Sequence, residues 1–219
     1  MLTKYQQARH DVREEVLNAV ELLANCNQEA LKALEASDTN LLQEAREKLK
    51  DFSKRTEKID NDIVLIFARY TPEARDLREM VSYLKITSAL NRIKTNTNNY
   101  LKNMQSMLNE DDVNIIQFIK ESLYINRSTV TAFDKIIEMF KTFDDNDKIK
   151  QLATEIDVEY AKTDDVYALL EKSVIQKMSD GRAEEYFNLL KYIRKNLKII
   201  DRLESISQRI IFARMGGKL

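Results

Sequence analysis

Apolar residues recur at intervals of three and four along almost the whole chain, which is the spacing of one face of an α-helix. Short polar segments interrupt this pattern at residues 37–40, 70–73, 109–112, 144–147 and 179–181. The pattern therefore predicts helices over about 5–35, 41–70, 72–108, 113–143, 148–178 and 183–215. At about 1.5 Å per residue, each helix would be roughly 45 Å long.

The polar segments contain residues that begin and end helices. Residues 37–40 offer hydroxyl and carboxylate groups suited to capping the second helix. Thr71 is expected to cap the third helix, with Pro72 at its first position. Gly216 and Gly217 are expected to close the sixth. Because the connections are only a few residues long, neighbouring helices must run antiparallel.

The second half of the chain repeats the first. The third helix contains Leu90-Asn91-Arg92-Ile93, and the sixth contains Ile200-Asp201-Arg202-Leu203. In both copies an arginine sits between apolar residues near the middle of the helix. We therefore predict an all-α fold of two tandem antiparallel three-helix bundles, residues 1–109 and 110–219, related by internal duplication.

Composition supports helices and excludes several classes of protein. The 3 glycines and 1 proline are too few for the many connections of a sheet. The 35 basic and 36 acidic residues give a net charge of −1, so no long-range field points to nucleic acid. A single cysteine excludes an intrachain disulfide and favours the cytoplasm. The polar N-terminus and the lack of a long apolar run predict neither a signal peptide nor a membrane span.

The sequence shows no catalytic constellation. His10 is the only histidine, lies on a charged turn, and is interpreted as a surface residue. A dimetal enzyme in a helix bundle would need Glu-x-x-His pairs, which a single histidine cannot supply. Cys26 is interpreted as a small packing residue, with a redox switch as the alternative. We therefore predict that the protein is not an enzyme.

The segment that leads into the third helix resembles the PhoU family. In that family a proline turn is followed by an alanine and a D-L-R triplet, and the helix then carries the motif L-E-R-x-G-D. Here Pro72, Ala74 and Asp76-Leu77-Arg78 match the turn and the triplet, while Leu90 and Arg92 match two positions of the motif. The resemblance covers essentially the whole chain, because the helix number, helix lengths and duplication also agree.

The resemblance implies a cytoplasmic regulator of phosphate uptake. Such a protein would bind the ATPase of a phosphate ABC transporter and a sensor histidine kinase. It would damp the phosphate-starvation response when phosphate is plentiful, through binding and conformational coupling. It would reach the membrane only through these partners, and a homodimer is expected because relatives commonly form dimers. The alternative is a helical scaffold or accessory protein of a sodium–phosphate cotransporter or a potassium transporter.

Metal binding is where the sequence departs from the family. Members often carry carboxylates four residues apart in the motif, which are ligands that hard or borderline cations favour. Asn91 and Thr95 occupy these positions in the first copy, and Ser205 replaces one in the second. Asp201 remains, and Glu204 could form a weak pair with it, although solvated acids on a helix surface are the preferred interpretation of both. We therefore expect no cofactor, and leave open only a divalent or iron cation at these two acids.

The remaining candidates are charged residues of the two copies: Asp76, Arg78, Arg92 and Arg202. Asp76 and Arg78 are two residues apart on a helix and so do not face one another. Arginine suits partly buried ion pairs because its planar fork satisfies several acceptors. Arg78 and Arg92 are therefore predicted to pair with acids on neighbouring helices, such as Asp60 or Asp62. Partner docking is the alternative role.

Overall fold

The computed structural model describes residues 2–109, 112–142, 144–176 and 183–217. Within these ranges the chain forms seven α-helices and no strand: α1 (Leu2–Ala36), α2 (Thr39–Glu47), α3 (Phe52–Tyr70), α4 (Ala74–Leu108), α5 (Val113–Lys141), α6 (Asn146–Gln176) and α7 (Ala183–Met215). The six predicted helical spans are confirmed, with the second divided into α2 and α3. The predicted turn at 179–181 lies outside the described residues. None of the described helices is both long enough and apolar enough to cross a membrane.

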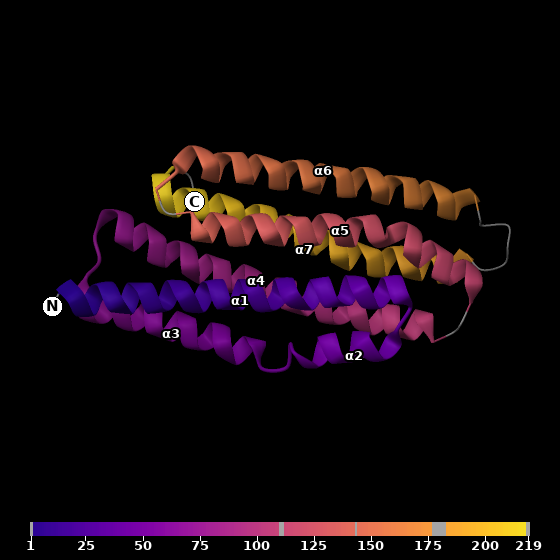
Figure 1. The fold of residues 1–219 in the computed structure, drawn as a ribbon, viewed down its shortest axis with the longest axis horizontal. Coiled ribbons are helices and arrows are strands. Elements are labelled where there is room, and N and C mark those ends of the chain that lie inside the picture. The colour runs from indigo at the N-terminus through magenta and orange to yellow at the C-terminus, as the bar shows by residue number, and fades with distance from the viewer. Residues whose placement is uncertain (1, 110–111, 143, 177–182, 218–219) are drawn as a thin grey trace.

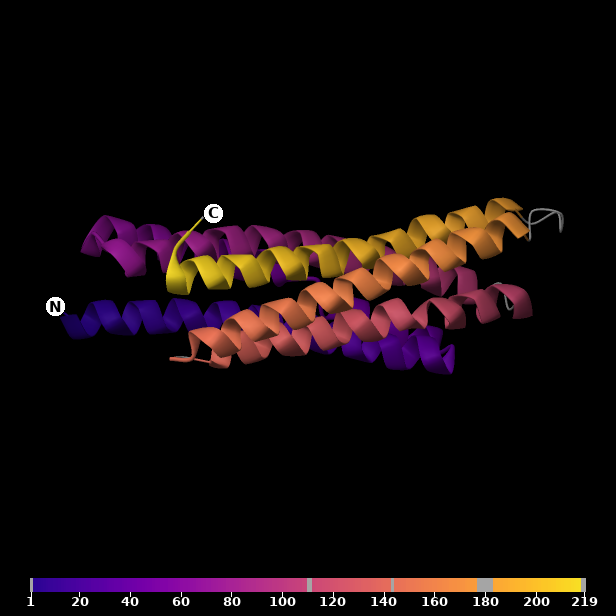
Figure 2. The same cartoon turned by 90° about the horizontal axis from the view of Figure 1, so that it is seen from above.

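The helices pack as two antiparallel bundles lying side by side (Figure 1). One bundle contains α1, α2, α3 and α4, and the other contains α5, α6 and α7. The bundles meet where α1 packs against α5 and where α4 packs against α7, which is the most extensive contact between two helices. Figure 2 shows the same helices from above, running along the length of an elongated molecule. The predicted all-α helical-bundle fold is confirmed, and the internal duplication stays a prediction.

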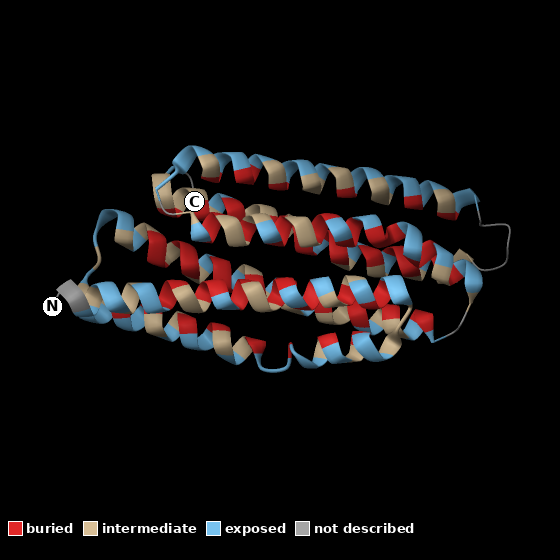
Figure 3. Cartoon of the chain, in the orientation of Figure 1, coloured by how far each residue is buried: buried red, intermediate tan, exposed pale blue. Residues whose placement is uncertain are grey.

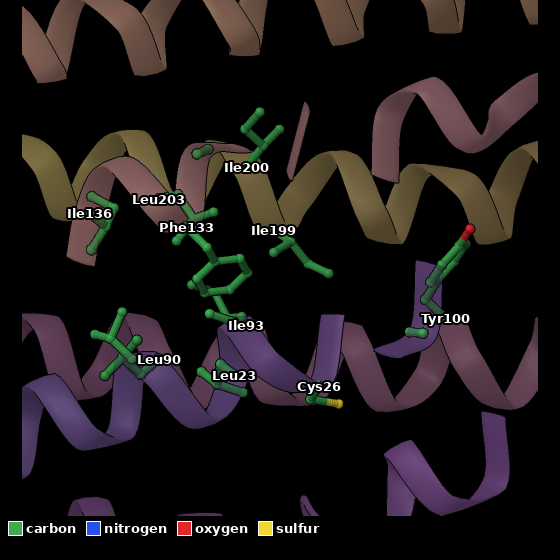
Figure 4. Close-up of a cluster of buried hydrophobic side chains, with 14 of the residues drawn as sticks. Leu23, Cys26, Leu90, Ile93, Tyr100, Phe133, Ile136, Ile199, Ile200 and Leu203 are labelled. Atoms are coloured by element: carbon green, nitrogen blue, oxygen red, sulfur yellow. The ribbon is translucent and has the colours of Figure 1, made fainter. Parts of the chain in front are cut away.

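Buried side chains form one apolar core that continues through both bundles. The buried positions lie on the inward side of each helix, so that α6 is buried along one side and exposed along the other (Figure 3). Figure 4 shows the centre of the core, where α1, α4, α5 and α7 contribute Leu23, Leu90, Ile93, Phe133, Ile199, Ile200 and Leu203. The division of the chain into domains at residues 1–109 and 110–219 stays a prediction, and the core is continuous across that boundary.

The second predicted helix is interrupted at residues 48–51. The amides of Leu49 and Lys50 bond to the carbonyls of Arg46 and Glu47, at 3.0 and 3.2 Å, three residues back instead of four. This is the tighter turn of a 3₁₀-helix. Leu49 is nevertheless buried, and the buried positions continue at spacings of three and four on both sides of the turn. The apolar pattern therefore predicted one helix where the structure has two.

The turn between α3 and α4 differs from its prediction. Thr71 ends α3 in the left-handed conformation, with φ at 45°, and does not cap α4. Pro72 lies outside both helices, and α4 begins at Ala74 after its N-cap residue Glu73. Proline commonly follows a helix C-cap because it cannot continue the helix. The predicted helix start at Pro72 was therefore wrong.

The other two predicted caps are confirmed. The Asp38 carboxylate accepts hydrogen bonds from the backbone amides of Asn40 and Leu41, at 2.9 and 3.1 Å. These are amides that the first turn of a helix leaves without a backbone partner. At the other end of the chain, Gly216 follows α7 with φ at 79°, a conformation that glycine adopts without steric cost.

Candidate functional site

Three of the charged candidate residues lie on α4 and the fourth lies on α7. Asp76 and Arg78 belong to its first turns, and Arg92 lies near its middle. Arg202 lies near the middle of α7. Because α4 and α7 run antiparallel and in contact (Figure 1), Arg92 and Arg202 line one groove. The duplicated arginines of the sequence are therefore brought together in the structure.

At the first turns of α4, a network of ion pairs and hydrogen bonds connects this helix to α1. The Nη1 and Nη2 atoms of Arg9 lie 2.8 Å from Asp76 Oδ1 and 2.6 Å from Glu79 Oε2. Tyr5 donates a hydrogen bond to Asp76 at 2.9 Å, and Tyr83 donates one to Glu79 at 2.8 Å. Glu79 and Tyr83 are buried. The structure thus places Asp76 in an ion pair with α1.

In this network, hydrogen bonds and nearby charges act against the effect of burial on the pKa of Glu79. Burial alone would raise the pKa of Glu79, but hydrogen bonds from Arg9 and Tyr83, together with the charge of Arg9, hold that pKa below its ordinary value. Burial and the hydrogen bond to Asp76 raise the pKa of Tyr5 to about 12. At neutral pH Glu79 is therefore ionised and Tyr5 protonated, and the network stabilises the contact between α1 and α4.

Arg78 lies apart from this network, near the end of α7. Its Nε atom is 3.7 Å from the position that a Cβ would occupy on Gly216, and that Nε is buried without a hydrogen-bond partner. The predicted ion pairs of Arg78 and Arg92 with acids of α3 do not form in the described part of the chain. Instead, Asp60 accepts a hydrogen bond from the Thr87 hydroxyl at 2.6 Å.

A groove between α4 and α7 passes both motif arginines. It consists of two adjoining cavities, of about 550 and 260 Å³, and Ser88, Arg92 and Arg202 line both. The other charged residues that line the groove are Asp60, Lys85, Lys198 and Arg209. Five cationic side chains therefore share the groove with a single carboxylate.

The positions where the family motif carries carboxylates also line this groove. Asn91 and Thr95 line its larger cavity, and Ser205 lines the smaller. The Asn91 amide donates to the Thr56 hydroxyl at 2.7 Å, and the Thr95 hydroxyl donates to the carbonyl of Asn91 at 2.9 Å. None of these three side chains can carry a negative charge. The motif therefore supplies no carboxylate pair to the groove.

Asp201 and Glu204 have an acidic neighbour on α6. Burial, followed by the charges of Asp157 and Asp201, raises the pKa of Glu204. The Asp201 carboxylate lies 3.7 Å from Nε of the adjacent Arg202. Among the described residues, no three His, Cys, Asp or Glu side chains are arranged to hold a metal ion. The cation at Asp201 and Glu204 stays a prediction, and the described residues offer it no third such ligand.

The single cysteine and the single histidine lie away from the groove. Cys26 is fully buried, and its thiol donates to the carbonyl of Ala45 at 3.2 Å. Burial raises the pKa of this thiol to about 12, so the reactive thiolate is not formed at neutral pH. His10 is exposed on α1. Both residues match their interpretation as packing and surface residues.

Sequence reasoning missed several residues of these two regions. Lys85 lies seven residues before Arg92, and Arg209 lies seven residues after Arg202, so each pair is two helical turns apart on one face. That spacing was the signal that could have revealed a cationic stripe on each helix. Nothing in the sequence indicated Arg9, because its contact with α4 depends on how α1 packs.

Comparison with known proteins relates the chain to one family. A model of the PhoU domain matches residues 16–104. PhoU from Pseudomonas aeruginosa is similar in structure, with 23% identity, coverage of 97% of this chain and 100% of that chain, and a TM-score of 0.72. The phosphate transport system regulatory protein PhoU from Streptococcus pneumoniae is similar at 19% identity, with 98% and 99% coverage and a TM-score of 0.70. Curated proteins compared by sequence give no match. At these identities the structural likeness establishes the fold.

Proposed function

We propose that the chain is a member of the PhoU family and acts as a cytoplasmic, non-enzymatic regulator of phosphate uptake and phosphate-starvation signalling. It would bind the ATPase of a phosphate ABC transporter and a sensor histidine kinase, and damp the starvation response when phosphate is plentiful. The observation that carries this proposal is the match of a PhoU-domain model to residues 16–104. Two PhoU structures that match over nearly the full chain support it, one of them named as a regulator of the phosphate transport system.

A binding role suits the side chains that the helices present to solvent. Leu77 is exposed between Asp76, which Arg9 holds, and Arg78, which lies beside Gly216. Its neighbours therefore fix the direction in which this leucine points. Exposed apolar side chains on a rigid helix are suited to the centre of a protein interface. The D-L-R triplet would then form part of the docking surface, with Leu77 as the contact residue.

Capture from membranes tests this proposal. The tagged full-length chain would be incubated with detergent-solubilised membranes of its source, cross-linked and purified, and the bound proteins would be identified by mass spectrometry. We expect the transporter ATPase and the kinase to be recovered. Leu77→Asp should reduce their recovery at least about fivefold, because a charge in an interface core remains desolvated and unpaired. Leu169→Asp on α6 is the matched control, since Leu169 is also an exposed helical leucine.

Other results would contradict the proposal. Recovery of a sodium–phosphate cotransporter or a potassium transporter would instead favour an accessory role for that transporter. Capture of no membrane protein would remove the support for a transport regulator and leave only the fold. Light scattering on the same preparation would test the homodimer that we also propose, which predicts twice the chain mass of 25.6 kDa.

A further inference from the structure

The groove between α4 and α7 is strongly cationic. Two of its cationic side chains come from α4 and three from α7: Lys85, Arg92, Lys198, Arg202 and Arg209. The one carboxylate in its lining, Asp60, is engaged by the Thr87 hydroxyl. In a protein with a net charge of −1, this is a local excess of positive charge and not a property of the whole surface.

Most of these cations lack the acidic partners that basic residues have elsewhere on the molecule, although the charge of Arg209 acts to lower the pKa of Glu204. In the described part of the chain, four of them make no hydrogen bond or ion pair: Lys85, Arg92, Lys198 and Arg209. Within the same residues, Arg202 forms one ion pair, with its neighbour Asp201 at 3.7 Å. By contrast, Arg127 pairs with Glu35 at 2.8 Å and Lys141 pairs with Glu21 at 2.8 Å. The groove therefore holds guanidinium and ammonium groups that are free to bind an anion.

The cations form two rows that face the same space. On α4, Lys85, Ser88, Arg92 and Asn96 follow one another at spacings of three or four residues, which places them on one helix face. On α7 the row from Lys198 to Arg209 has the same spacing. Each row covers eleven residue steps, or about 16 Å at 1.5 Å per residue. Because the helices are antiparallel, the two rows lie alongside each other.

We propose that this groove binds a linear oligophosphate, an anion with two or more linked phosphoryl groups. Arginine side chains bind phosphate oxygens through paired hydrogen bonds, and lysines add point charge. Ser88 and Ser205 contribute hydroxyl donors between the cations. A single orthophosphate would engage only the central pair, Arg92 and Arg202, whereas linked phosphates extend along both rows. The ligand is either free inorganic oligophosphate or the triphosphate tail of a nucleotide.

The lining of the groove favours recognition of the phosphates and not of a nucleobase. Among the described residues, its walls carry no aromatic side chain on which a base could stack. The groove is also open to solvent, so attraction between the charges is screened by salt. We therefore expect inorganic tripolyphosphate to bind at least as tightly as ATP, and both to bind more weakly as ionic strength rises.

Isothermal titration calorimetry on the full-length chain tests this site. The probes are orthophosphate, pyrophosphate, tripolyphosphate, ATP and a short polyglutamate peptide, each at low and at high salt. We expect tripolyphosphate to bind at least about tenfold more tightly than orthophosphate or polyglutamate, because bidentate contacts from arginine suit the phosphoryl group. Arg92→Glu with Arg202→Glu should weaken tripolyphosphate binding at least about tenfold, since each substitution reverses a charge at the centre of the groove.

A charge-matched variant separates the site from general attraction. Arg75→Glu with Lys120→Glu changes the net charge equally at two exposed positions outside the groove, and should leave binding unchanged. Arg92→Gln with Arg202→Gln provides a second groove variant that introduces no new charge, and thermal melts check that every variant folds. Equal effects of groove and control variants would overturn the proposal.

The choice of probe also separates the possible ligands. ATP binding tenfold more tightly than tripolyphosphate would assign a nucleotide to the groove, and equal or weaker ATP binding would assign the free oligophosphate. Orthophosphate as tight as tripolyphosphate would overturn the extended site. Polyglutamate as tight as tripolyphosphate would overturn it in favour of an acidic protein segment. The test requires neither transporter nor kinase, so its outcome is independent of the proposed regulatory role.

Discussion

Two regions of α4 use arginine in opposite ways. At its first turns, Arg9 from α1 contacts two carboxylates, Asp76 and Glu79, at 2.8 and 2.6 Å. Near its middle, Arg92 shares a groove with Arg202 and makes no ion pair in the described structure. The first arrangement is closed, because each charge has its partner inside the protein. The second is open, because Arg92 has no acidic partner among the described residues and can be satisfied there by water or by a ligand.

The difference teaches which charged residues serve the fold and which are available for binding. A buried carboxylate is stable as an anion only with a partner, so Glu79 depends on Arg9. Cations that line one groove repel each other, so their placement adds nothing to stability. A cluster of this kind is therefore better explained by a ligand than by folding. Substitutions in the Arg9 network should consequently lower stability, whereas substitutions of the groove cations should leave stability nearly unchanged and weaken ligand binding.

The largest effect is expected from Arg9→Ala. The substitution removes the ion pair and hydrogen bond of the buried Glu79 with Arg9 and leaves the Tyr83 hydroxyl and the charge of Arg214, which should lower the free energy of unfolding by about 3 kcal/mol. Urea unfolding at pH 7 measures this change. Arg127→Ala is the control, because it breaks an exposed ion pair with Glu35 and should cost less than about 1 kcal/mol. Equal losses in both variants would mean that the network of Arg9, Asp76 and Glu79 does not stabilise the contact between α1 and α4.

A smaller and pH-dependent effect is expected from Glu79→Gln. The folded protein lowers the pKa of Glu79, so its carboxylate contributes stability above the unfolded pKa, and this contribution is lost as pH falls through the lowered folded value. The variant should therefore be less stable by about 1–2 kcal/mol at pH 7. Its deficit should disappear in acid, where the wild-type carboxyl is also protonated. A deficit that stays constant with pH would show that ionisation of Glu79 does not matter.

The fold was predictable from the sequence because one simple pattern encodes it. Spacings of three and four residues identified the helical spans, and the internal duplication suggested by the repeated arginine frames stays a prediction. The interruption at residues 48–51 was not predictable, because the buried Leu49 keeps the apolar spacing of three and four residues that a continuous helix would show. A tighter turn changes the hydrogen bonds of the backbone without changing which side chains are buried. The start of α4 was misplaced because Pro72 suits a helix start as well as a position after a helix end.

The candidate site was predicted in part. The sequence singled out Arg92 and Arg202 as equivalent positions, and both line the groove. Their predicted partners on α3 were wrong, because pairing across helices depends on the rotation of each helix about its axis. In the structure, Asp60 accepts a hydrogen bond from the Thr87 hydroxyl, and Arg92 lies beside α7. Residues supplied by distant segments, such as Arg9, could be found only from the packed structure.

Glu204→Gln extends the comparison to an acid for which burial and acidic neighbours outweigh the charge of its cationic neighbour Arg209. Burial, with the charges of Asp157 and Asp201, raises the pKa of Glu204, so its ionised form disfavours folding above the unfolded pKa. Replacing it with a neutral isostere should raise the melting temperature at pH 7 by about 1 °C. The gain should vanish below pH 4, where the carboxyl is protonated in both states. A lower melting temperature at pH 7 would show instead that the carboxylate has a stabilising partner.

The smallest effect is expected from Arg92→Ala, and it tests the open region most directly. Arg92 is exposed and lies in the groove with Arg202 and Lys198, so its removal takes away repulsion and no ion pair. The free energy of unfolding should change by less than about 0.5 kcal/mol. Any difference from wild type should favour the variant at low salt and fade as salt screens the repulsion. Urea unfolding at two ionic strengths measures both the change in the free energy of unfolding and its dependence on salt. A loss comparable to that of Arg9→Ala would show that Arg92 stabilises the fold, and the distinction between the closed and open regions of α4 would fail.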